Sequence, residues 1–382
     1  RTKYDCIVIG AGIQGSFTAY HLAKHRKKTL LLEQFPLPHS RGSSHGQTRI
    51  IRRAYAEHFY TDMMEECYQL WAELEKESGT QLYRKTGLLV LAKSGNEEYE
   101  TVCKNMTEKQ IPWENLSPAE MKVRYPGLFL SPGEVACCDI NGGVLYADKA
   151  LRAVQMLFKQ MGGVIRDGEK VMHIKPGPVV TVTTNSSIYE ADGIVITAGP
   201  WAQKVLRPLG LQLPLKTLRI NVCYWREKIP GKSGILQSLP CFLGFNLNGE
   251  EHEVYGLPSQ EYPGLIKVGP VNTDRITNTI VGTCEAKQAY IAEKIGRFKW
   301  KCQASARNQQ YFSYVQNTPD ENFILDHHPL HKNIVIGAGF SGHGFKLSPV
   351  VGKILSELCT GEKESYDLKP FRISRFKTPL KA

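Results

Sequence analysis

A short apolar run that leads straight into a glycine-rich turn constrains this chain more than any other feature. Residues 7–9 are apolar and β-branched, and the run is too short for a helix, so we expect a buried strand. Gly10, Gly12 and Gly15 follow with the spacing G-x-G-x-x-G. Residues 16–23 then have the apolar periodicity of a helix. A strand, a tight turn and a helix therefore open the chain in that order.

A second apolar run, residues 29–32, ends at Glu33 and completes a βαβ unit. In such units the glycines permit the tight turn, the approach of a pyrophosphate to the backbone and the close packing of helix on strand. The helix N-terminus offers unpaired N–H groups to the phosphates, and Glu33 can accept hydrogen bonds from ribose hydroxyls. A glycine-rich turn without a ligand is the alternative, but it does not explain an acid at this distance. The unit predicts a dinucleotide cofactor, FAD or NAD.

Residues 333–343 nearly repeat the opening stretch. Gly337, Gly339 and Gly342 follow an apolar run with the same spacing as the first three glycines. No second strand ending in an acid follows, so we expect a helix N-terminus near the ligand edge of the sheet rather than a second dinucleotide site. Together with the run that ends at Gly199, three strands of one sheet would lead into glycine turns. Such an arrangement suits a large, extended dinucleotide and favours FAD over NAD.

The chain is long enough for two domains, with 382 residues of which 42% are hydrophobic. No apolar run is long enough to cross a membrane. The first strand begins within a few residues of Arg1, which leaves no room for a signal peptide. The 10 cysteines include no C-x-x-C pair, and their spacing with histidine predicts no metal site. We therefore expect free thiols in a reducing compartment.

The net charge of +11 comes from 48 Lys and Arg against 37 Asp and Glu. The basic residues are dispersed rather than clustered with aromatic residues, so we do not expect nucleic-acid binding. A positive field would instead attract small anionic or carboxylate substrates. Three arginines lie within residues 49–53, just after an irregular loop at residues 34–45. A solvated basic segment explains them as well as a binding site does, although Ile50 and Ile51 imply partial burial.

Apolar periodicity predicts the other elements. We expect helices over residues 60–77, 117–125, 148–161, 286–306 and 349–358. We expect strands over residues 86–91, 164–165, 194–196, 215–224, 253–256 and 265–268, and a hairpin of residues 179–184 and 187–190. The capping-box pattern from Ser117 to Glu120 marks the start of one helix.

Several motifs together resemble the monomeric sarcosine oxidase family. They are the glycine pattern of residues 10–15, the sequence GQTRIIR at residues 46–52 and the sequence IGAGFSGHGFK at residues 336–346. TPDENFILD at residues 318–326 and SYDLKPFRISR at residues 365–375 add to the resemblance. Within the family, the chain is most similar to the vertebrate peroxisomal members, which are also known as L-pipecolate oxidases.

The resemblance implies an FAD-dependent oxidase of secondary amino acids such as sarcosine, L-pipecolate and L-proline. A hydride equivalent would pass from the carbon next to nitrogen to the flavin, the imine would hydrolyse, and O2 would be reduced to H2O2. A monomer and a peroxisomal location are also implied. The family layout implies an α/β fold with two domains. A discontinuous, Rossmann-like FAD domain would comprise residues 1–80, 142–213 and 320–382, and a mainly antiparallel substrate domain with helices would comprise residues 81–141 and 214–319.

The resemblance also implies roles for individual residues. Arg52 and Lys346 match the residues that bind the substrate carboxylate, and a planar guanidinium with an ammonium group suits that task. Tyr255 matches an active-site tyrosine with substrate-binding and catalytic roles.

Lys267 matches the lysine credited with oxygen activation, because a cation near the flavin would stabilise the charge that develops when O2 takes its first electron. An ordinary solvent-facing strand lysine is the alternative. His45 and Arg49 match catalytic residues beside the flavin ring. The cofactor contacts implied by the resemblance are Gly10, Gly12, Ile13, Gln14, Gly15, Glu33, Gln34, Ser43, Val171, Gly342, Gly344, Phe345 and Lys346.

The chain departs from the family pattern where the flavin is attached. Family members attach FAD through a cysteine six residues before the proline of TPDE, and Ser313 stands there in this chain. Val315 and Val271 stand where an aromatic residue and a histidine are common. Covalent attachment therefore stays open. Two alternatives to an oxidase stay open as well: a flavin dehydrogenase that passes electrons to a carrier protein, and a flavoprotein with impaired catalysis.

Overall fold

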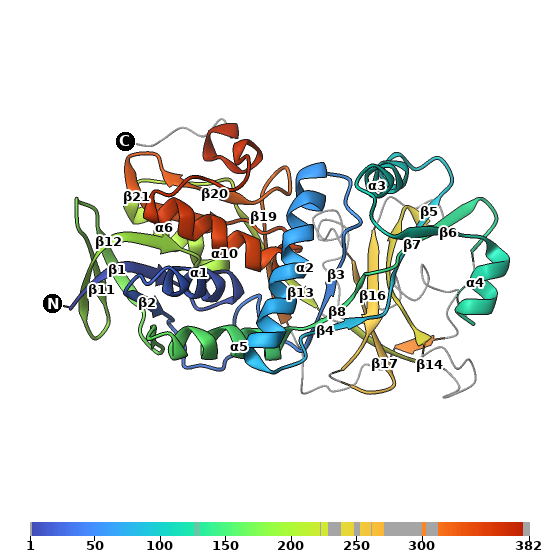
Figure 1. Cartoon of the computed structure of the whole chain (residues 1–382), viewed down its shortest axis with the longest axis horizontal. Coiled ribbons are helices and arrows are strands. Elements are labelled where there is room, and N and C mark those ends of the chain that lie inside the picture. Colours follow the sequence, from blue (N-terminus) through green and yellow to red (C-terminus); the bar gives the residue numbers. More distant parts are fainter. Residues whose placement is uncertain are drawn as a thin grey trace.

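A computed structural model describes residues 2–126, 128, 130–221, 223–227, 238–247, 253–260, 262–270, 300–302 and 312–376. Two eight-stranded sheets dominate this part of the chain and lie toward opposite ends of the long axis (Figure 1). Helices surround the first sheet and cover parts of the second (Figure 1). The predicted α/β fold class is confirmed.

The first sheet contains the predicted βαβ unit. Five parallel strands form its centre in the order β9 (Val164–Arg166), β2 (Thr29–Leu32), β1 (Thr2–Ile9), β12 (Ile188–Ile196) and β21 (His331–Ala338). Antiparallel strands complete it: β20 (Ile324–His328) beside β21, and β10 (Val171–Lys175) and β11 (Val180–Thr184) beyond β12. Because β1, β12 and β21 are neighbours, their three glycine turns open at one edge of the sheet, as the repeated motif predicts.

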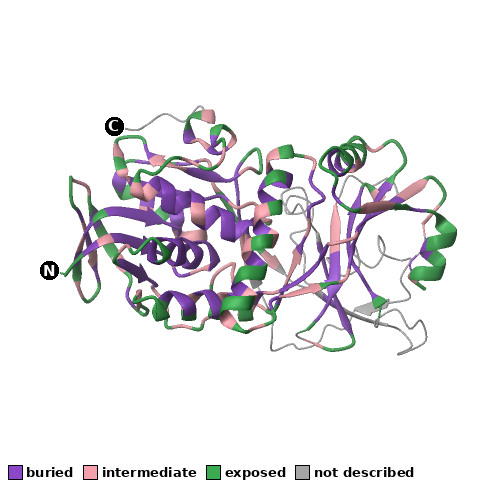
Figure 2. Ribbon diagram, viewed as in Figure 1, coloured by how far each residue is buried: buried purple, intermediate pink, exposed green. Residues whose placement is uncertain are grey.

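Three long helices pack against this sheet, α1 (Ile13–Lys24), α5 (Ala147–Gln160) and α10 (Gly344–Thr360), and a fourth, α2 (His58–Ser78), packs on α5 and α10. The pair α1 and α10 is the most deeply buried, as the purple ribbons in Figure 2 show. Gly352 permits their close contact, since a Cβ there would lie 2.6 Å from the Cβ of Phe17. Both helices begin at the glycine-rich edge of the sheet, so their N-termini face the same region.

Helix α10 begins five residues before the predicted helix at residues 349–358. The difference arises at Pro349, which resembles a helix start in the sequence but lies inside the helix. Proline has no N–H to donate to the carbonyl of Phe345 four residues earlier. The hydroxyl of Ser348 donates to that carbonyl instead, at 2.7 Å. The hydroxyl thus replaces the missing N–H donor, and the helix begins at Gly344. Its N-terminus therefore lies at the cavity described below.

The second sheet is mainly antiparallel. In spatial order its strands are β18 (Trp300–Cys302), β14 (Cys223–Glu227), β17 (Leu265–Pro270), β16 (Val254–Pro258), β15 (Cys241–Phe245), β5 (Leu88–Lys93), β7 (Glu134–Asp139) and β6 (Trp113–Leu116). Only β15 and β5 pair in parallel within this described sheet. Helices α3 (Glu97–Glu108) and α4 (Pro118–Arg124) lie beside it (Figure 1).

Shorter elements connect the two sheets. The strands are β3 (Thr48–Ile51), β4 (Tyr83–Lys85) and β8 (Gly143–Tyr146) in one small sheet, and β13 (Lys216–Asn221) with β19 (Phe312–Asn317) in another. The helical turns are Gly199–Trp201, α6 (Ala202–Leu206), Arg207–Leu209, Lys369–Phe371 and Ile373–Arg375. Among the residues described, no helix has both the length and the apolar composition needed to cross a bilayer.

Most predicted elements are confirmed, including the capping box of Ser117 and Glu120 and the hairpin of β11 and β12. The hairpin strand and the following apolar run form the single strand β12 rather than two. The predicted helix at residues 286–306 is wrong for residues 300–302, which form β18 and pair with β14. The other residues of that range lie outside the described residues.

Candidate active site

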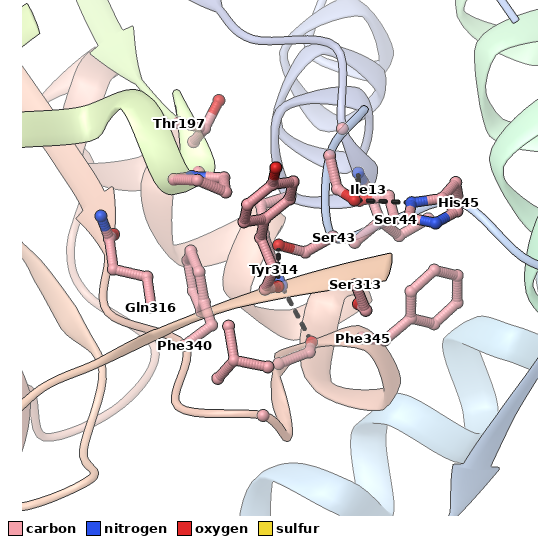
Figure 3. A pocket seen from close by; sticks show the side chains of 18 of the residues that line it. Ile13, Ser43, Ser44, His45, Thr197, Ser313, Tyr314, Gln316, Phe340 and Phe345 are labelled. Atoms are coloured by element: carbon pink, nitrogen blue, oxygen red, sulfur yellow. Dashed lines mark hydrogen bonds between the residues drawn. The ribbon is translucent and has the colours of Figure 1, made fainter. Parts of the chain in front are cut away.

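A cavity of about 1320 Å³ is lined by residues from both large sheets. Pockets for small molecules usually measure roughly 300–1,000 Å³, so this one can hold more than a small substrate. The glycine turns after β1, β12 and β21 reach it, as do the loop of residues 34–47 and strands β16, β17 and β19. Figure 3 shows its lining around Ser43, Tyr314 and Phe345.

Two positions of the first glycine turn, Gly10 and Gly15, have no room for a side chain. Gly10 has φ +102°, and a Cβ there would lie 2.5 Å from the carbonyl oxygen of Thr197. A Cβ on Gly15 would lie 1.9 Å from the carbonyl oxygen of Gly10. The backbone N–H of Ile13, in the first turn of α1, donates to Ser44 Oγ at 2.9 Å (Figure 3). The turn therefore holds the N-terminus of α1 against the cavity.

Glu33 lies at the cavity, where the sequence places a ribose-binding acid. It is 7% exposed, and its two carboxylate oxygens accept hydrogen bonds from the backbone N–H groups of Ala11 at 3.0 Å and Phe35 at 3.1 Å. Its Oε1 also lies 3.4 Å from His39 Nε2. Glu33 thus ties the glycine turn to the following loop, a structural role that the sequence pattern did not reveal. Gln34 lines the cavity beside it.

The two glycine motifs meet at the cavity. Gln14 Nε2, from the first motif, donates to the carbonyl oxygen of Gly344, from the second, at 2.9 Å. A Cβ on Gly344 would lie 2.9 Å from that same Nε2 atom and 2.6 Å from the Cβ of Phe340. Gly342 has φ +80°, which favours glycine. The N-termini of α1 and α10 are therefore joined by a direct hydrogen bond, although their motifs are more than 300 residues apart.

These residues fit a bound FAD. Gly12 is the N-cap of helix α1 and provides no side-chain cap, so the N–H groups that follow Ile13, whose own N–H is bonded to Ser44 Oγ, suit the phosphates. Gln14 Oε1 is buried and has no hydrogen-bond partner among the residues that the structure describes, and a buried acceptor of this kind is costly unless a ligand satisfies it. Val171 and Gly199 extend the lining beyond the glycine turn. The cavity therefore has the size, the N–H donors and the acid that a dinucleotide with a further ring system requires.

Arg49 organises the loop that carries Ser43 and His45. Its guanidinium donates to the carbonyl oxygens of Ser43 at 2.8 Å and His45 at 2.6 Å, and it lies 5.4 Å from the ring centre of Phe345. Ser43 Oγ donates to the carbonyl oxygen of Tyr314 at 2.5 Å (Figure 3). All five residues line the cavity. The structure therefore brings together the residues that the sequence predicts beside the flavin ring.

Arg52 and Lys346 lie against the same buried aromatic ring. The guanidinium carbon of Arg52 is 3.8 Å, and Lys346 Nζ is 5.3 Å, from the ring centre of Tyr55. Lys346 is 6% exposed and donates to the carbonyl oxygen of His343 at 3.2 Å. Burial, together with the charge of Arg52, holds the pKa of Lys346 well below its usual range. An anion between these two cations would relieve their repulsion and restore the charge of the ammonium group.

Tyr55 and His343 form a hydrogen-bonded pair that the sequence did not predict. The hydroxyl of Tyr55 is 3.1 Å from His343 Nδ1, and His343 Nε2 is 3.2 Å from the carbonyl oxygen of Glu321. Burial holds the pKa of His343 well below its usual range, so the ring is neutral and has one donor. Because a carbonyl can only accept, Nε2 carries the proton and Nδ1 accepts from Tyr55. Both residues adjoin predicted site residues, but nothing in their spacing indicates that they meet.

Lys267 and Tyr255 line the cavity from strands β17 and β16. Lys267 is only 6% exposed, which excludes the alternative interpretation as an ordinary strand lysine that faces solvent. Its Nζ donates to the carbonyl oxygen of Thr48 at 3.4 Å, next to Arg49. A Cβ on Gly269 would lie 2.9 Å from the hydroxyl oxygen of Tyr255, so the glycine leaves room for this ring. The second sheet thus contributes a cation and a phenol to the cavity from these two strands, and β14 adds the phenol of Tyr224.

Strand β19 brings Ser313 and Val315 to the cavity. In the view of Figure 3, Ser313 and Phe345 both lie to the right of Tyr314. In the described part of the chain, no cysteine lines the cavity. Val271, the other departure from the family pattern, lies outside the described residues. Within those same residues, no group of three or more His, Cys, Asp or Glu could hold a metal ion.

Four glutamates that the sequence analysis did not single out line the Arg52 end of the cavity: Glu57, Glu98, Glu253 and Glu321. Burial and the neighbouring charge of Glu98 raise the pKa of Glu253. The sequence gives no signal for this group, because each glutamate comes from a different segment of the chain. Their charges oppose those of Arg52 and Lys346, so this end of the cavity offers both signs to a zwitterion.

Comparison with known proteins extends over the whole chain. The profile of the family of FAD dependent oxidoreductases (DAO) matches residues 5–358. The chain is 56% identical to the peroxisomal sarcosine oxidase of Homo sapiens over 391 residues, which covers 100% of this chain and 98% of that protein. It is 34% identical to the monomeric sarcosine oxidase of Bacillus sp. (strain B-0618), covering 98% of this chain and 96% of that protein.

Solved structures show the same fold. L-proline dehydrogenase from P. horikoshii superposes with a TM-score of 0.80 at 22% identity, covering 98% of each chain. The amino acid oxidase NikD superposes with a TM-score of 0.80 at 20% identity, covering 97% of this chain and 98% of that one. Fold, cavity and relatives agree: the chain belongs to the FAD-dependent oxidoreductases and, among them, to the sarcosine oxidases, with FAD as its cofactor.

Proposed function

We propose that the protein oxidises secondary amino acids such as sarcosine, L-pipecolate and L-proline, with O2 as the electron acceptor. The observation that carries this proposal is the pair formed by the partly buried Arg52 and the buried Lys346, both held against Tyr55. Two cations in a poorly solvated site suit one carboxylate, because a bidentate guanidinium fixes its plane and the ammonium group adds charge. The high identity to sarcosine oxidases supports the same substrate class.

Each group in the cavity has a proposed part in the reaction. Arg52 and Lys346 would bind the carboxylate, and Tyr255 would contact the substrate from β16. Bound FAD would accept the hydride equivalent from the carbon next to nitrogen and then reduce O2 to H2O2. Lys267, with Arg49 and His45 nearby, would offer positive charge where O2 becomes reduced. The amine must be neutral when its neighbouring carbon loses hydride, so activity should rise with pH; a flat profile would contradict this step.

We infer that FAD is held without a covalent bond at position 313. A serine hydroxyl is a much weaker nucleophile than the cysteine thiolate found there in the family. Acid precipitation of the pure protein tests this inference. We expect a colourless pellet and a yellow supernatant. A yellow pellet would show covalent flavin and would overturn it.

We also propose a cellular location, an oligomeric state and a division into domains. The names of the human and mouse relatives support a peroxisomal location, and the names of the bacterial relatives support a monomer. The two large sheets support division of the chain into a discontinuous FAD domain, residues 1–80, 142–213 and 320–382, and a substrate domain, residues 81–141 and 214–319. The cavity would then be the active site between the two domains.

The electron acceptor can be tested directly. The purified protein is mixed with L-pipecolate under air, and H2O2 is measured; a parallel sample under nitrogen receives an artificial dye acceptor. We expect stoichiometric H2O2 under air. Dye reduction without H2O2 would instead indicate a dehydrogenase that uses a carrier protein. Failure of both reactions would indicate a flavoprotein with impaired catalysis.

A further inference from the structure

Two cysteine thiols lie close together outside the cavity. Cys103 is on helix α3 and Cys137 is on strand β7, and their sulfur atoms are 3.6 Å apart. Cys103 is partly exposed, whereas Cys137 is fully buried. A disulfide bond is about 2.05 Å long, so the two sulfur atoms would have to approach by about 1.5 Å to form one. The pair is therefore reduced but close to bonding distance.

The surroundings make the two thiols unequal. Cys103 lies near the surface of α3, whereas Cys137 lies inside β7 with no exposed area. The contact with Cys137 lowers the pKa of Cys103, and the contact with Cys103 together with burial raises the pKa of Cys137. Reactive cysteines combine an acidic, accessible thiol with a second thiol within reach. Cys103 has the properties of the attacking thiol and Cys137 those of the resolving one.

In a second close pair, the pKa of the partly exposed thiol is raised rather than lowered. Cys6 and Cys359 have sulfur atoms 3.3 Å apart, one below the first glycine turn and the other at the end of α10. Cys6 is buried and Cys359 is partly exposed, and the contact with Cys6 together with burial holds the pKa of Cys359 well above its usual range. Proximity and exposure are thus similar in the two pairs, and the pair on α3 and β7 is distinguished by the lowered pKa of Cys103 together with its place next to Val102, which lines the cavity. The pair Cys6 and Cys359 provides an internal reference.

We propose that Cys103 and Cys137 form a peroxide-reactive dithiol that closes to an intramolecular disulfide. The Cys103 thiolate would attack one oxygen of H2O2, which breaks the O–O bond and gives a sulfenic acid and hydroxide. The Cys137 thiol would then attack the sulfenic sulfur, which forms the S–S bond and releases water. In total, two thiols and one H2O2 give one disulfide and two waters. The source of H2O2 within the protein rests on the proposed oxidase function.

The position of the pair connects it to the cavity. Helix α3 carries Asn105, whose Nδ2 donates to the carbonyl oxygens of Tyr55 at 3.1 Å and Ala56 at 2.5 Å. Val102, next to Cys103, lines the cavity. A disulfide would therefore link helix α3 to strand β7 of the second sheet. Through Asn105, the same helix holds the backbone of Tyr55. Cys103 is therefore one residue away from the wall of the cavity in which H2O2 would form.

The test uses the full-length holoprotein, reduced and then freed of reductant. It is treated with about one equivalent of H2O2, alkylated and mapped by peptide mass spectrometry. We expect a crosslinked peptide joining Cys103 to Cys137, formed before any link between Cys6 and Cys359. Free thiols at both positions, or an earlier link between Cys6 and Cys359, would overturn the proposal.

Three variants locate the reaction. Cys137→Ala should stop at a sulfenic acid on Cys103, which dimedone traps, and Cys103→Ala should give neither adduct nor crosslink. Cys138→Ala is the matched control, because Cys138 follows Cys137 on β7 but faces a different hydrophobic cluster, and it should crosslink like the unmodified chain. If Cys138→Ala lost the crosslink while Cys137→Ala kept it, Cys138 would be the resolving thiol, and the proposal would be contradicted.

The source of peroxide is tested separately. Turnover of L-pipecolate under air should produce the same crosslink without added H2O2, and catalase should suppress it. A crosslink with added H2O2 but none during turnover would support the dithiol and count against the proposed oxidase function. The two failures are therefore distinguishable.

Discussion

Two cations held against one buried aromatic ring are the clearest sign of chemistry among the single residues. Arg52 and Lys346 repel each other, and burial holds the pKa of Lys346 well below its usual range. Tyr55 offers the face of its ring to both and is fixed by a neutral His343. Such an arrangement is costly, because neither cation is fully solvated, and the glutamates at this end of the cavity offset only part of the cost. A bound substrate carboxylate would place a further negative charge between the two cations.

Lys346→Met tests this account of carboxylate binding. The variant keeps the length of the side chain and removes the ammonium group. Loss of one charged contact of about 2 kcal/mol should raise KM for L-pipecolate about 30-fold, with a smaller effect on kcat. Steady-state kinetics at several substrate concentrations measures both constants.

Lys353→Met is the matched control. Lys353 lies on the same helix, but its ammonium group pairs with Glu66 at 2.7 Å outside the cavity. We expect no change in KM for this variant. Equal KM values for Lys346→Met and the unmodified chain would show that Lys346 does not bind the carboxylate.

At the scale of elements, the start of α1 depends on a glycine that no other residue can replace. A Cβ on Gly15 would lie 1.9 Å from the carbonyl oxygen of Gly10 and 2.6 Å from Thr197 Oγ1. Gly15→Ala should therefore displace the helix from β1, cost about 3 kcal/mol or more, and yield protein without yellow colour. Flavin absorbance per mole of pure protein measures the effect.

Gly79→Ala serves as the comparison, because Gly79 ends α2 at φ +62° with no atom within 4 Å of an added Cβ. It should lower the free energy of unfolding by only about 1 kcal/mol and leave the flavin content unchanged. Full flavin content in Gly15→Ala would show that the close contact is not needed for cofactor binding.

The contact between α1 and α10 predicts a dependence of stability on pH. His21 Nε2 is 2.8 Å from the carbonyl oxygen of Pro349, and burial lowers the pKa of His21 to about 4. In the unfolded chain His21 takes up a proton near pH 6.5, whereas in the folded chain it stays neutral until about pH 4. Stability is therefore complete above pH 6.5 and falls as the pH decreases. The loss between pH 7 and pH 5 should be about 2 kcal/mol.

His21→Gln isolates this effect, because glutamine keeps a donor for the carbonyl of Pro349 but does not titrate. Urea unfolding at pH 7 and pH 5 should show a smaller loss of stability for the variant than for the unmodified chain. Equal losses would mean that His21 does not cause the pH dependence.

The elements show what a sequence can predict. Local patterns located β1, α1, β2 and the glycine turns, because tight turns and buried strands have direct sequence requirements. They failed where a distant contact decides the structure. Ser348 replaces the missing donor of Pro349, so α10 extends further than the proline suggests. Residues 300–302 have helical periodicity but pair with β14 as a strand.

For the whole molecule, the fold class and the cofactor followed from two copies of one motif. The hydrogen bond from Gln14 to Gly344 shows why both copies are needed, since it joins the two helix N-termini at one cavity. The cluster of glutamates and the pair of Tyr55 and His343 could not be predicted, because their members lie in separate segments that only the folded chain brings together.

A secondary amino acid that binds in this cavity should reduce the bound FAD. The most direct measurement mixes the purified holoprotein with L-pipecolate or sarcosine without oxygen and records the flavin absorption band. We predict that the band bleaches, and that it returns when air is admitted with formation of H2O2. A flavin band that stays unchanged with saturating L-pipecolate, sarcosine and L-proline would contradict the account.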